Sequence, residues 1–177
     1  MYVRGYDKDG RALIYMRPSN ENTNHEDNNM IYLVHQLEKA IACSQKNEQG
    51  KICLVIDYDG MKLSQVPSVS SSKKTLNILQ CHYCERMYRV YICNPPLVFK
   101  TMYAVVKPFV DPVTRQKLCW CVGKDGSDQM MDDVGGPEKA AVQLEKCCGS
   151  SETVRDFDNV EYSRLPLTVA FDENVNY

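Results

Sequence analysis

The sequence predicts an α/β sandwich, in which helices cover a central sheet. Strand-like runs alternate with segments of helical spacing along residues 11–122. The run Ile52-Cys53-Leu54-Val55-Ile56 is continuously apolar, as expected of a strand that is covered on both faces. Hydrophobic residues make up 44% of the 177 residues and charged residues 25%, which is enough for one domain with a sizeable core.

The first part of the chain predicts a strand and a long helix. Residues 5–10 read as a turn, and residues 11–16 read as a short strand that ends before Pro18. Residues 19–29 are rich in Asn and Glu and predict a loop. An amphipathic helix of about four turns follows. Its apolar positions are Met30, Leu33, Val34, Leu37, Ala40 and Ile41.

The later elements continue the alternation. Helical spacing predicts helices over residues 66–79 and 97–106, and strands are expected at residues 87–92 and 117–122. Beyond Gly123 the pattern weakens to a short helix at residues 138–144 and an extended stretch at the end. We therefore expect one domain over residues 1–150 and a carboxy-terminal tail over residues 151–177.

The charge distribution points away from nucleic acid. The net charge is −2, yet residues 81–124 carry seven Lys and Arg against only Glu85 and Asp111. Such a local excess suits an anionic ligand or an anionic membrane surface, because nucleic-acid binding usually requires a basic domain. The alternative is an ordinary solvated face.

Cysteine usage and hydropathy predict a reduced, cytoplasmic protein. The nine cysteines are an odd number and form no pattern that resembles a secreted disulfide framework. No run approaches the roughly 20 apolar residues that span a bilayer. The amino terminus also lacks the basic and then apolar pattern of a signal peptide.

Asp57-Tyr58-Asp59-Gly60 is a candidate catalytic motif. An apolar strand followed by Asp-x-Asp-Gly is how one class of magnesium-dependent phosphatases presents its nucleophile, here Asp57. Asp132 and Asp133 are the candidate metal ligands for this chemistry. The alternative is a turn whose acids cap the backbone and face solvent, and we favour it because a strand and a long helix precede the motif.

Cys81-His82-Tyr83-Cys84 has the spacing of half a zinc site or of a redox pair. A structural zinc site needs four ligands, and the adjacent pair Cys147-Cys148 is too tight to complete it. A redox cysteine is expected at a helix amino terminus, whereas this motif ends a helix. We therefore expect no metal site and treat these cysteines as small core or rim residues.

Residues 82–117 combine an apolar middle with polar ends. Asp111 and Pro112 predict a helix start, with Thr114 and Lys117 three residues apart on one face. An anion site is one interpretation, and an edge salt bridge between Lys117 and Glu85 is the other. The apolar segment 97–106 is hydrophobic nearly all round, which indicates burial or a cover over an apolar ligand.

Together these residues resemble the CRAL-TRIO lipid-binding family, specifically the phosphatidylinositol transfer proteins of fungi and plants. The resemblance covers about residues 6–122. It rests on Asp7-Lys8-Asp9-Gly10-Arg11 with Ile14-Tyr15, on residues 54–60, on His82-Tyr83-Cys84-Glu85-Arg86-Met87, on Asn94-Pro95-Pro96, and on Lys107-Pro108-Phe109-Val110-Asp111-Pro112-Val113-Thr114. The last three motifs, in that order and spacing, are specific.

The resemblance implies a CRAL-TRIO-like α/β sandwich whose mixed sheet floors an apolar lipid cavity, with residues 97–106 as a mobile gating helix. Carried over by position, the lipid head-group residues are Glu85, Thr114 and Lys117, with Tyr83 as a choline-contact position. The lipid-tail gate comprises Phe99, Met102, Tyr103, Val106 and Phe109. The implied ligand is a phospholipid, and no cofactor or metal is expected.

Two departures from the family pattern qualify what the ligand is. Ile52 and Leu54 stand where the family has hydroxyl residues for a phosphocholine head, which weakens the case for phosphatidylcholine although Tyr15 and Tyr83 remain at choline-contact positions. The family's amino-terminal helical module does not precede Met1, so less complete enclosure of the lipid is expected.

The resemblance favours a carrier of phosphatidylinositol that visits membranes transiently and presents lipid to other membranes or to lipid-modifying enzymes, and that is not an enzyme. The phosphatase using Asp57, and an interaction module that keeps the fold without binding lipid, are the alternatives.

Overall fold

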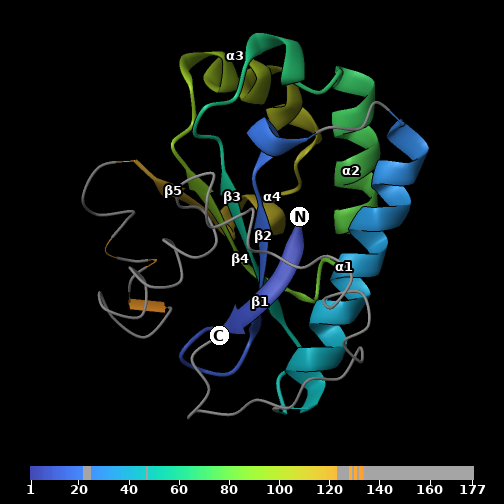
Figure 1. Ribbon diagram of the computed structural model, residues 1–177, viewed down its shortest axis with the longest axis vertical. Helices are drawn as coiled ribbons and strands as arrows, with labels where there is room; N and C mark the ends of the chain where they lie inside the picture. The colour runs from blue at the N-terminus through green and yellow to red at the C-terminus, as the bar shows by residue number, and fades with distance from the viewer. Residues whose placement is uncertain (22–24, 47, 123–127, 129, 131, 134–177) are drawn as a thin grey trace.

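A mixed five-stranded sheet forms the centre of the computed structural model, which describes residues 1–21, 25–46, 48–122, 128, 130, 132 and 133. Its strands lie in the order of the chain: β1 (Tyr2–Tyr6), β2 (Ala12–Met16), β3 (Ile52–Asp57), β4 (Met87–Cys93) and β5 (Leu118–Cys121). β1 pairs with β2 as an antiparallel hairpin, and the other neighbours are parallel. The mixed sheet and the α/β class agree with the sequence-based prediction (Figure 1).

Helices fill the crossovers between the parallel strands. They are α1 (Glu26–Lys46), α2 (Val69–His82), α3 (Leu97–Val106) and α4 (Pro112–Gln116), with the short 3-10 helices η1 (Pro18–Asn20), η2 (Leu63–Gln65) and η3 (Lys107–Phe109). In Figure 1, α1 and α2 run side by side and α3 lies across the upper end of the sheet. Side chains of all three pack in one core cluster with alternate strand residues, so these helices cover the same face of the sheet.

Strand alternation divides the core into two clusters. Ile14, Leu54 and Ile92 face the helices, whereas Leu13 and Tyr91 face the opposite side. β3 is apolar on both faces, and its first four residues are buried. The continuous run at residues 52–56 therefore predicted its environment correctly.

The prediction from the sequence missed the strand β1 and made the helix α1 too short. β1 was not predicted, because its five residues include Gly5 and its pairing with β2 shifts register between Val3 and Tyr6, which leaves no regular alternation. α1 has 21 residues rather than about four turns. Its first turn carries Glu26 and Asp27, whose charge favours a helix start inside the expected loop.

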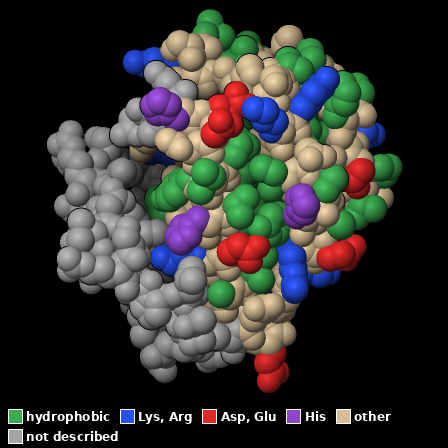
Figure 2. All heavy atoms as spheres, turned by 90° about the vertical axis from the view of Figure 1, so that its right-hand side faces the viewer, with side chains coloured by type: hydrophobic (Ala, Val, Ile, Leu, Met, Phe, Trp, Pro, Cys, Tyr) green, Lys and Arg blue, Asp and Glu red, His purple; other side chains and the backbone are tan. Residues whose placement is uncertain are grey.

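α2 is packed less tightly than the other long helices. It buries none of its residues completely, although Leu76, Ile78 and Leu79 are half-buried against the interior. Hydrophobic side chains gather over the middle of the face that α1 and α2 present (Figure 2). α2 therefore adds half-buried side chains to the helix-facing core, and no fully buried ones.

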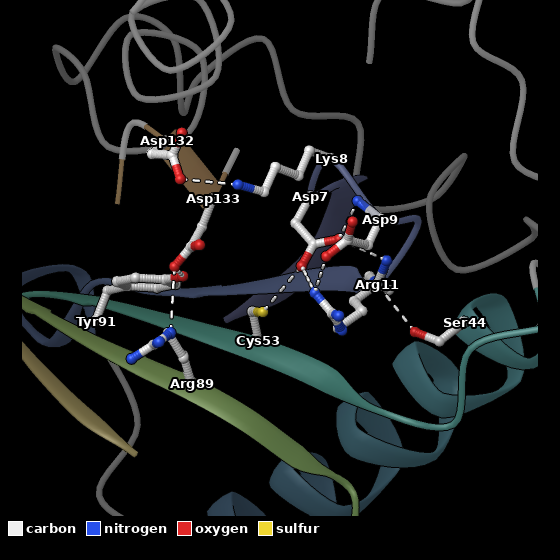
Figure 3. Close-up of polar contacts among 11 residues, drawn as sticks. Asp7, Lys8, Asp9, Arg11, Ser44, Cys53, Arg89, Tyr91, Asp132 and Asp133 are labelled. Carbon is white, nitrogen blue, oxygen red and sulfur yellow. Dashed lines mark hydrogen bonds and ion pairs between the residues drawn. The ribbon is translucent and has the colours of Figure 1, made fainter. Parts of the chain in front are cut away.

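A polar network lies on the face of the sheet opposite the helices (Figure 3). The buried carboxylate of Asp133 accepts a hydrogen bond of 2.5 Å from the Tyr91 hydroxyl and lies 3.3 Å from Arg89 Nε. Burial, and then this hydrogen bond, raise the pKa of Tyr91. The Lys8 backbone N–H donates to the Asp133 carbonyl at 2.9 Å, so the network joins this aspartate to the β1–β2 turn as well as to β4.

The same turn is fixed by Asp7. Its carboxylate accepts from the Asp9 and Arg11 backbone N–H groups and pairs with the Arg11 guanidinium at 2.8 Å. The segment Asp7–Arg11, one of the motifs that carry the family resemblance, therefore stabilises the turn of the β1–β2 hairpin.

We expect Asp133→Ala to lower the free energy of unfolding by about 2–3 kcal/mol, because it leaves the Tyr91 hydroxyl without its acceptor and Arg89 without its ion-pair partner. Urea denaturation measures this loss. The matched control is Asp132→Ala, whose exposed carboxylate pairs with Lys8 at 2.8 Å and should contribute little because solvent screens the pair. Equal losses for the two variants would show that the network does not hold this face.

Candidate functional site

Three of the four predicted head-group residues, Glu85, Thr114 and Lys117, lie near the starts of β4 and β5. Glu85 lies in the turn between α2 and β4, and Lys117 directly precedes β5. The half-buried Lys117 ammonium donates a hydrogen bond to the Cys84 backbone carbonyl, one residue before Glu85. No ion pair joins Glu85 to Lys117 in this described region, which gives the edge-salt-bridge alternative no support.

Thr114 is held beside this turn by the short helix α4. Asp111 caps the helix as predicted, since its carboxylate accepts from the Thr114 N–H at 2.9 Å. Hydrogen bonds from the Thr114 side chain and then from its backbone lower the pKa of Asp111. The Lys117 N–H in turn donates to the Thr114 carbonyl at 3.1 Å, so backbone geometry keeps Thr114 and Lys117 together.

A glutamine from α2 positions this segment. The Gln80 side-chain amide donates to the Phe109 carbonyl at 3.1 Å, and its oxygen accepts from the Asp111 N–H at 2.8 Å. Gln80 thereby holds the junction between η3 and α4 against α2. Sequence reasoning missed this residue, because a polar side chain on a helix carries no sign of a distant backbone partner.

Tyr83 lies in a polar pocket instead of beside Lys117. Its hydroxyl donates to Glu38 of α1 at 2.5 Å, and burial together with this bond raises the pKa of Tyr83 to about 12. The pocket has a volume of about 320 Å³ and is lined by Glu38, Ile41, Ala42, Gln45, His82, Tyr83 and Arg86. Glu38 was not predicted, since a glutamate on an exposed helix face is unremarkable in a sequence.

α3 has the predicted bounds and two different apolar faces. Phe99 and Val106 are buried, and Met102 and Tyr103 are half-buried against the sheet. On the other side, Leu97 is 81% exposed and Val105 is 50% exposed. The predicted gate residue Phe109 lies in η3, is 47% exposed, and has the Lys73 ammonium 3.9 Å from its ring centroid.

Aromatic contacts hold α3 to the sheet. The Phe99 ring lies 4.3 Å from Tyr58 and 5.9 Å from Trp120, measured between ring centroids. Tyr103 meets the same Trp120 edge-on at 4.9 Å. Burial raises the pKa of Tyr58. Tyr58 and Trp120 were not predicted as site residues, although the only tryptophan of the chain, placed on a strand, was a usable signal.

Asp57, the nucleophile of the phosphatase hypothesis, is hydrogen-bonded to the turn before α3. Asn94 has a left-handed backbone (φ 50°), and its amide donates to Asp57 at 3.0 Å. Asp57 is 2% exposed and also accepts from the Asp59 N–H at 3.0 Å. It therefore stabilises the strand end and the turn before α3. The turn interpretation was right about the cap, but it was wrong to place Asp57 in solvent, where only Asp59 lies.

The proposed metal ligands of that phosphatase lie elsewhere. Asp133 accepts from Tyr91 and pairs with Arg89. Asp57 instead accepts from Asn94 and from the Asp59 N–H, so the two carboxylates have separate partners. The described ranges contain no group of three His, Cys, Asp or Glu side chains that could hold a metal ion. The geometry gives the phosphatase hypothesis no support.

Comparisons with known proteins agree with the resemblance. A sequence profile of the CRAL/TRIO domain matches residues 1–136. The chain is 35% identical over 156 residues to CRAL-TRIO domain-containing protein C23B6.04c of Schizosaccharomyces pombe, which covers 82% of this chain and 15% of that protein. It is 28% identical over 120 residues to the phosphatidylinositol transfer protein PDR17 of Saccharomyces cerevisiae, covering 65% of this chain and 34% of that one. The chain thus spans about a third or less of the length of these two relatives.

A solved structure shows the same fold. The crystal structure of Sfh5 matches with a TM-score of 0.56 and 24% identity, over 67% of this chain and 46% of that chain.

We expect Asp111→Ala to cost about 1 kcal/mol of stability and to loosen Thr114, because the first turn of α4 loses its cap. Asn also caps, so Asp111→Asn should retain most of this stability. The lowered pKa means that the charged form is favoured by folding, so its contribution is present above about pH 4, the unfolded value, and is lost as the pH falls. Urea denaturation at pH 7 and at pH 3 measures both effects, and identical pH dependence in wild type and Asp111→Asn would contradict them.

Proposed function

The chain belongs to the CRAL/TRIO domain family, and we propose that it binds a phospholipid, favouring phosphatidylinositol, and transfers or presents it between membranes or to lipid-modifying enzymes. The observation that carries this proposal is an apolar helix packed on one sheet whose last strand begins beside a half-buried lysine. α3 packs its apolar side on the sheet, and Lys117 lies at the start of β5 in the same sheet. PDR17 is named a phosphatidylinositol transfer protein, which is consistent with this ligand.

The apolar side of the site has to offset the free energy that is lost when a lipid leaves its bilayer. Two acyl chains hold roughly 30 methylenes, which amounts to about 25 kcal/mol of lost burial. Candidate surface is the half-buried part of the helix-facing cluster, which includes Tyr58, Met102, Tyr103, Leu118 and Trp120. α3 and α2 bound this surface, since Ile78 and Leu79 of α2 pack against the same cluster.

The polar side supplies donors and an acceptor for an inositol phosphate. An ammonium has three donors, and the Cys84 carbonyl takes one from Lys117, which leaves two for phosphate oxygens. We assign the phosphate to Lys117 and Thr114, and the inositol hydroxyls to the exposed carboxylate of Glu85. Tyr83 borders the neighbouring pocket and contacts a head group only if the ligand extends toward α1.

The positions around β2 and β3 argue against a choline head group. Ile52 and Leu54 are fully buried in the helix-facing cluster and offer no hydroxyl. Tyr15 belongs to the opposite cluster, where its ring stacks on Tyr2 with centroids 5.9 Å apart. Neither feature supplies the contacts that phosphatidylcholine requires.

The outer side of α3 suits a transient contact with an anionic membrane. Exposed apolar side chains extend from α3 into α4, and cations lie among them. The apolar residues are Leu97, Val105, Phe109 and Val113, and the cations are Lys73, Lys100, Lys107 and Arg115. No helix in the described residues is long and apolar enough to cross a membrane. We therefore place the protein in the cytoplasm with reversible membrane contact.

The proposed activity makes and breaks no covalent bond, so the protein acts as a carrier and not as an enzyme. An interaction module of the same fold would lack the bound lipid. Native mass spectrometry of the purified full chain distinguishes these two functions, because a carrier retains a mass corresponding to phospholipid.

Lys117→Ala should weaken phosphatidylinositol loading by about 10- to 100-fold, the usual effect of removing a charge-assisted hydrogen bond to phosphate. Loading is measured by native mass spectrometry after incubation with vesicles that contain phosphatidylinositol. Lys51→Ala is the matched control, because this exposed lysine precedes β3 at the same end of the sheet. Unchanged loading of Lys117→Ala would remove Lys117 from the site.

Leu97→Asp should reduce binding to anionic vesicles by roughly 10-fold or more, because it replaces about 1.5–3 kcal/mol of apolar burial with a repelled charge. Vesicle co-sedimentation measures the change. Ile31→Asp is the control, since this α1 side chain is 69% exposed and lies outside the α3–α4 surface. Equal losses for both variants would show that α3 is not the membrane-facing element.

A further inference from the structure

Two cysteines face each other across β4 and β5. Cys93 and Cys121 are partners in the parallel register of these strands, and both side chains belong to the cluster on the face away from the helices. The Met130 thioether covers them: its Sδ lies 3.8 Å from Cys93 Sγ and 4.0 Å from Cys121 Sγ. Both thiols therefore point into one sulfur-lined space.

Strand geometry selects this pair among the nearby cysteines. Neighbouring strands lie about 4.7–4.9 Å apart, within the 4.4–6.8 Å range of Cα separations found in disulfides. Cys119 is also close, but it is two residues from Cys121 on the same strand, about 6.6 Å along the chain at the usual rise per residue. That separation lies at the upper limit for a disulfide.

We propose that Cys93 and Cys121 form an oxidation site, at which a hydroperoxide joins the two side chains in a disulfide between β4 and β5. The Cys121 thiolate attacks a peroxide oxygen, the O–O bond breaks, and water leaves after protonation of the departing oxygen. The Cys93 thiol then attacks the resulting sulfenic sulfur and displaces a second water. Two thiols and one hydrogen peroxide thus give one disulfide and two waters.

The surroundings favour Cys121 as the attacking thiol. A hydrogen bond from the Cys93 thiol, and then one from Cys119, lower the pKa of Cys121, whereas burial raises the pKa of Cys119 to about 11. Cys121 is also half-buried, whereas Cys93 and Cys119 are buried. A low thiol pKa and access to solvent are the two properties that make a cysteine reactive. The described stretch lacks a third ligand of the Cys, His or carboxylate kind, which favours covalent oxidation over metal binding.

The disulfide would close a ring around the proposed gate. Residues 94–120 connect the two cysteines, and they include α3, η3 and α4 with Thr114 and Lys117. Cys93 directly precedes Asn94, where the chain turns toward α3. Oxidation would therefore fix the spacing of the two strands from which the gate segment departs and to which it returns.

The test maps disulfides in the full chain. Reduced, desalted protein is exposed to hydrogen peroxide, its remaining thiols are alkylated, and it is digested with trypsin without reduction. Mass spectrometry should find residues 90–100 linked to residues 118–124, and dithiothreitol should separate them. Because the second peptide carries Cys119 as well as Cys121, fragmentation should locate the link on Cys121 and the alkyl group on Cys119.

Variants make the assignment specific. Cys121→Ser and Cys93→Ser should each abolish the linked peptide, whereas Cys81→Ser, which removes an exposed thiol on α2, should leave it unchanged. The proposal is overturned if wild-type Cys93 and Cys121 stay alkylatable at a peroxide concentration that oxidises Cys81. A Cys119–Cys121 link or a link between two chains would overturn it as well. None of these outcomes depends on whether the protein binds lipid.

Discussion

Most of the candidate site follows from one topological constraint, the parallel pairing of β4 with β5. Because both strands run in the same direction, the chain that leaves the carboxyl end of β4 must return to the amino end of β5 before it can pair. That crossover contains α3 and then α4. The apolar cover and the proposed anion site at Lys117 thus belong to the two ends of a single connection.

The ends of this crossover are fixed by directional bonds, and its middle is held by packing. Asn94 is bonded to Asp57 at the start, and Gln80 holds the Phe109–Asp111 backbone near the end. Between them, α3 depends on contacts of Phe99 and Tyr103 with the sheet. Apolar contacts are non-directional, so acyl chains can replace them at little cost. Displacing Asn94 would remove a hydrogen bond from the buried Asp57, and displacing Gln80 would break two bonds to the backbone of the η3–α4 junction. The expected motion is therefore an opening of α3 between two fixed ends.

Sequence reasoning recovered the elements whose signals are local. α3 was predicted with its observed bounds because Pro96 precedes it and only Lys100 and Thr101 interrupt its apolar residues. The Asp111 cap was predicted from Asp-Pro alone. β1 was missed because its pairing is irregular. Three contacts were also missed: the Glu38–Tyr83 hydrogen bond, the hydrogen bond between Gln80 and the Asp111 backbone, and the packing of Trp120 against Tyr103. Each of these depends on contacts more than 15 residues apart in the chain, which spacing rules do not address.

The two faces of the sheet perform separable tasks, and this separation limits how oxidation and lipid binding can interact. The helix-facing side offers apolar surface and Lys117, whereas the opposite side holds the Asp133 network and the Cys93–Cys121 pair. Strand residues alternate between the faces, so a disulfide on one side touches no proposed lipid contact on the other. Any coupling must pass through the spacing of β4 and β5, which sets the span that α3 has to bridge. Because the crossover is anchored at both ends, a change in that span would alter how easily its packed middle opens, and it would leave the chemistry of the head-group end unchanged.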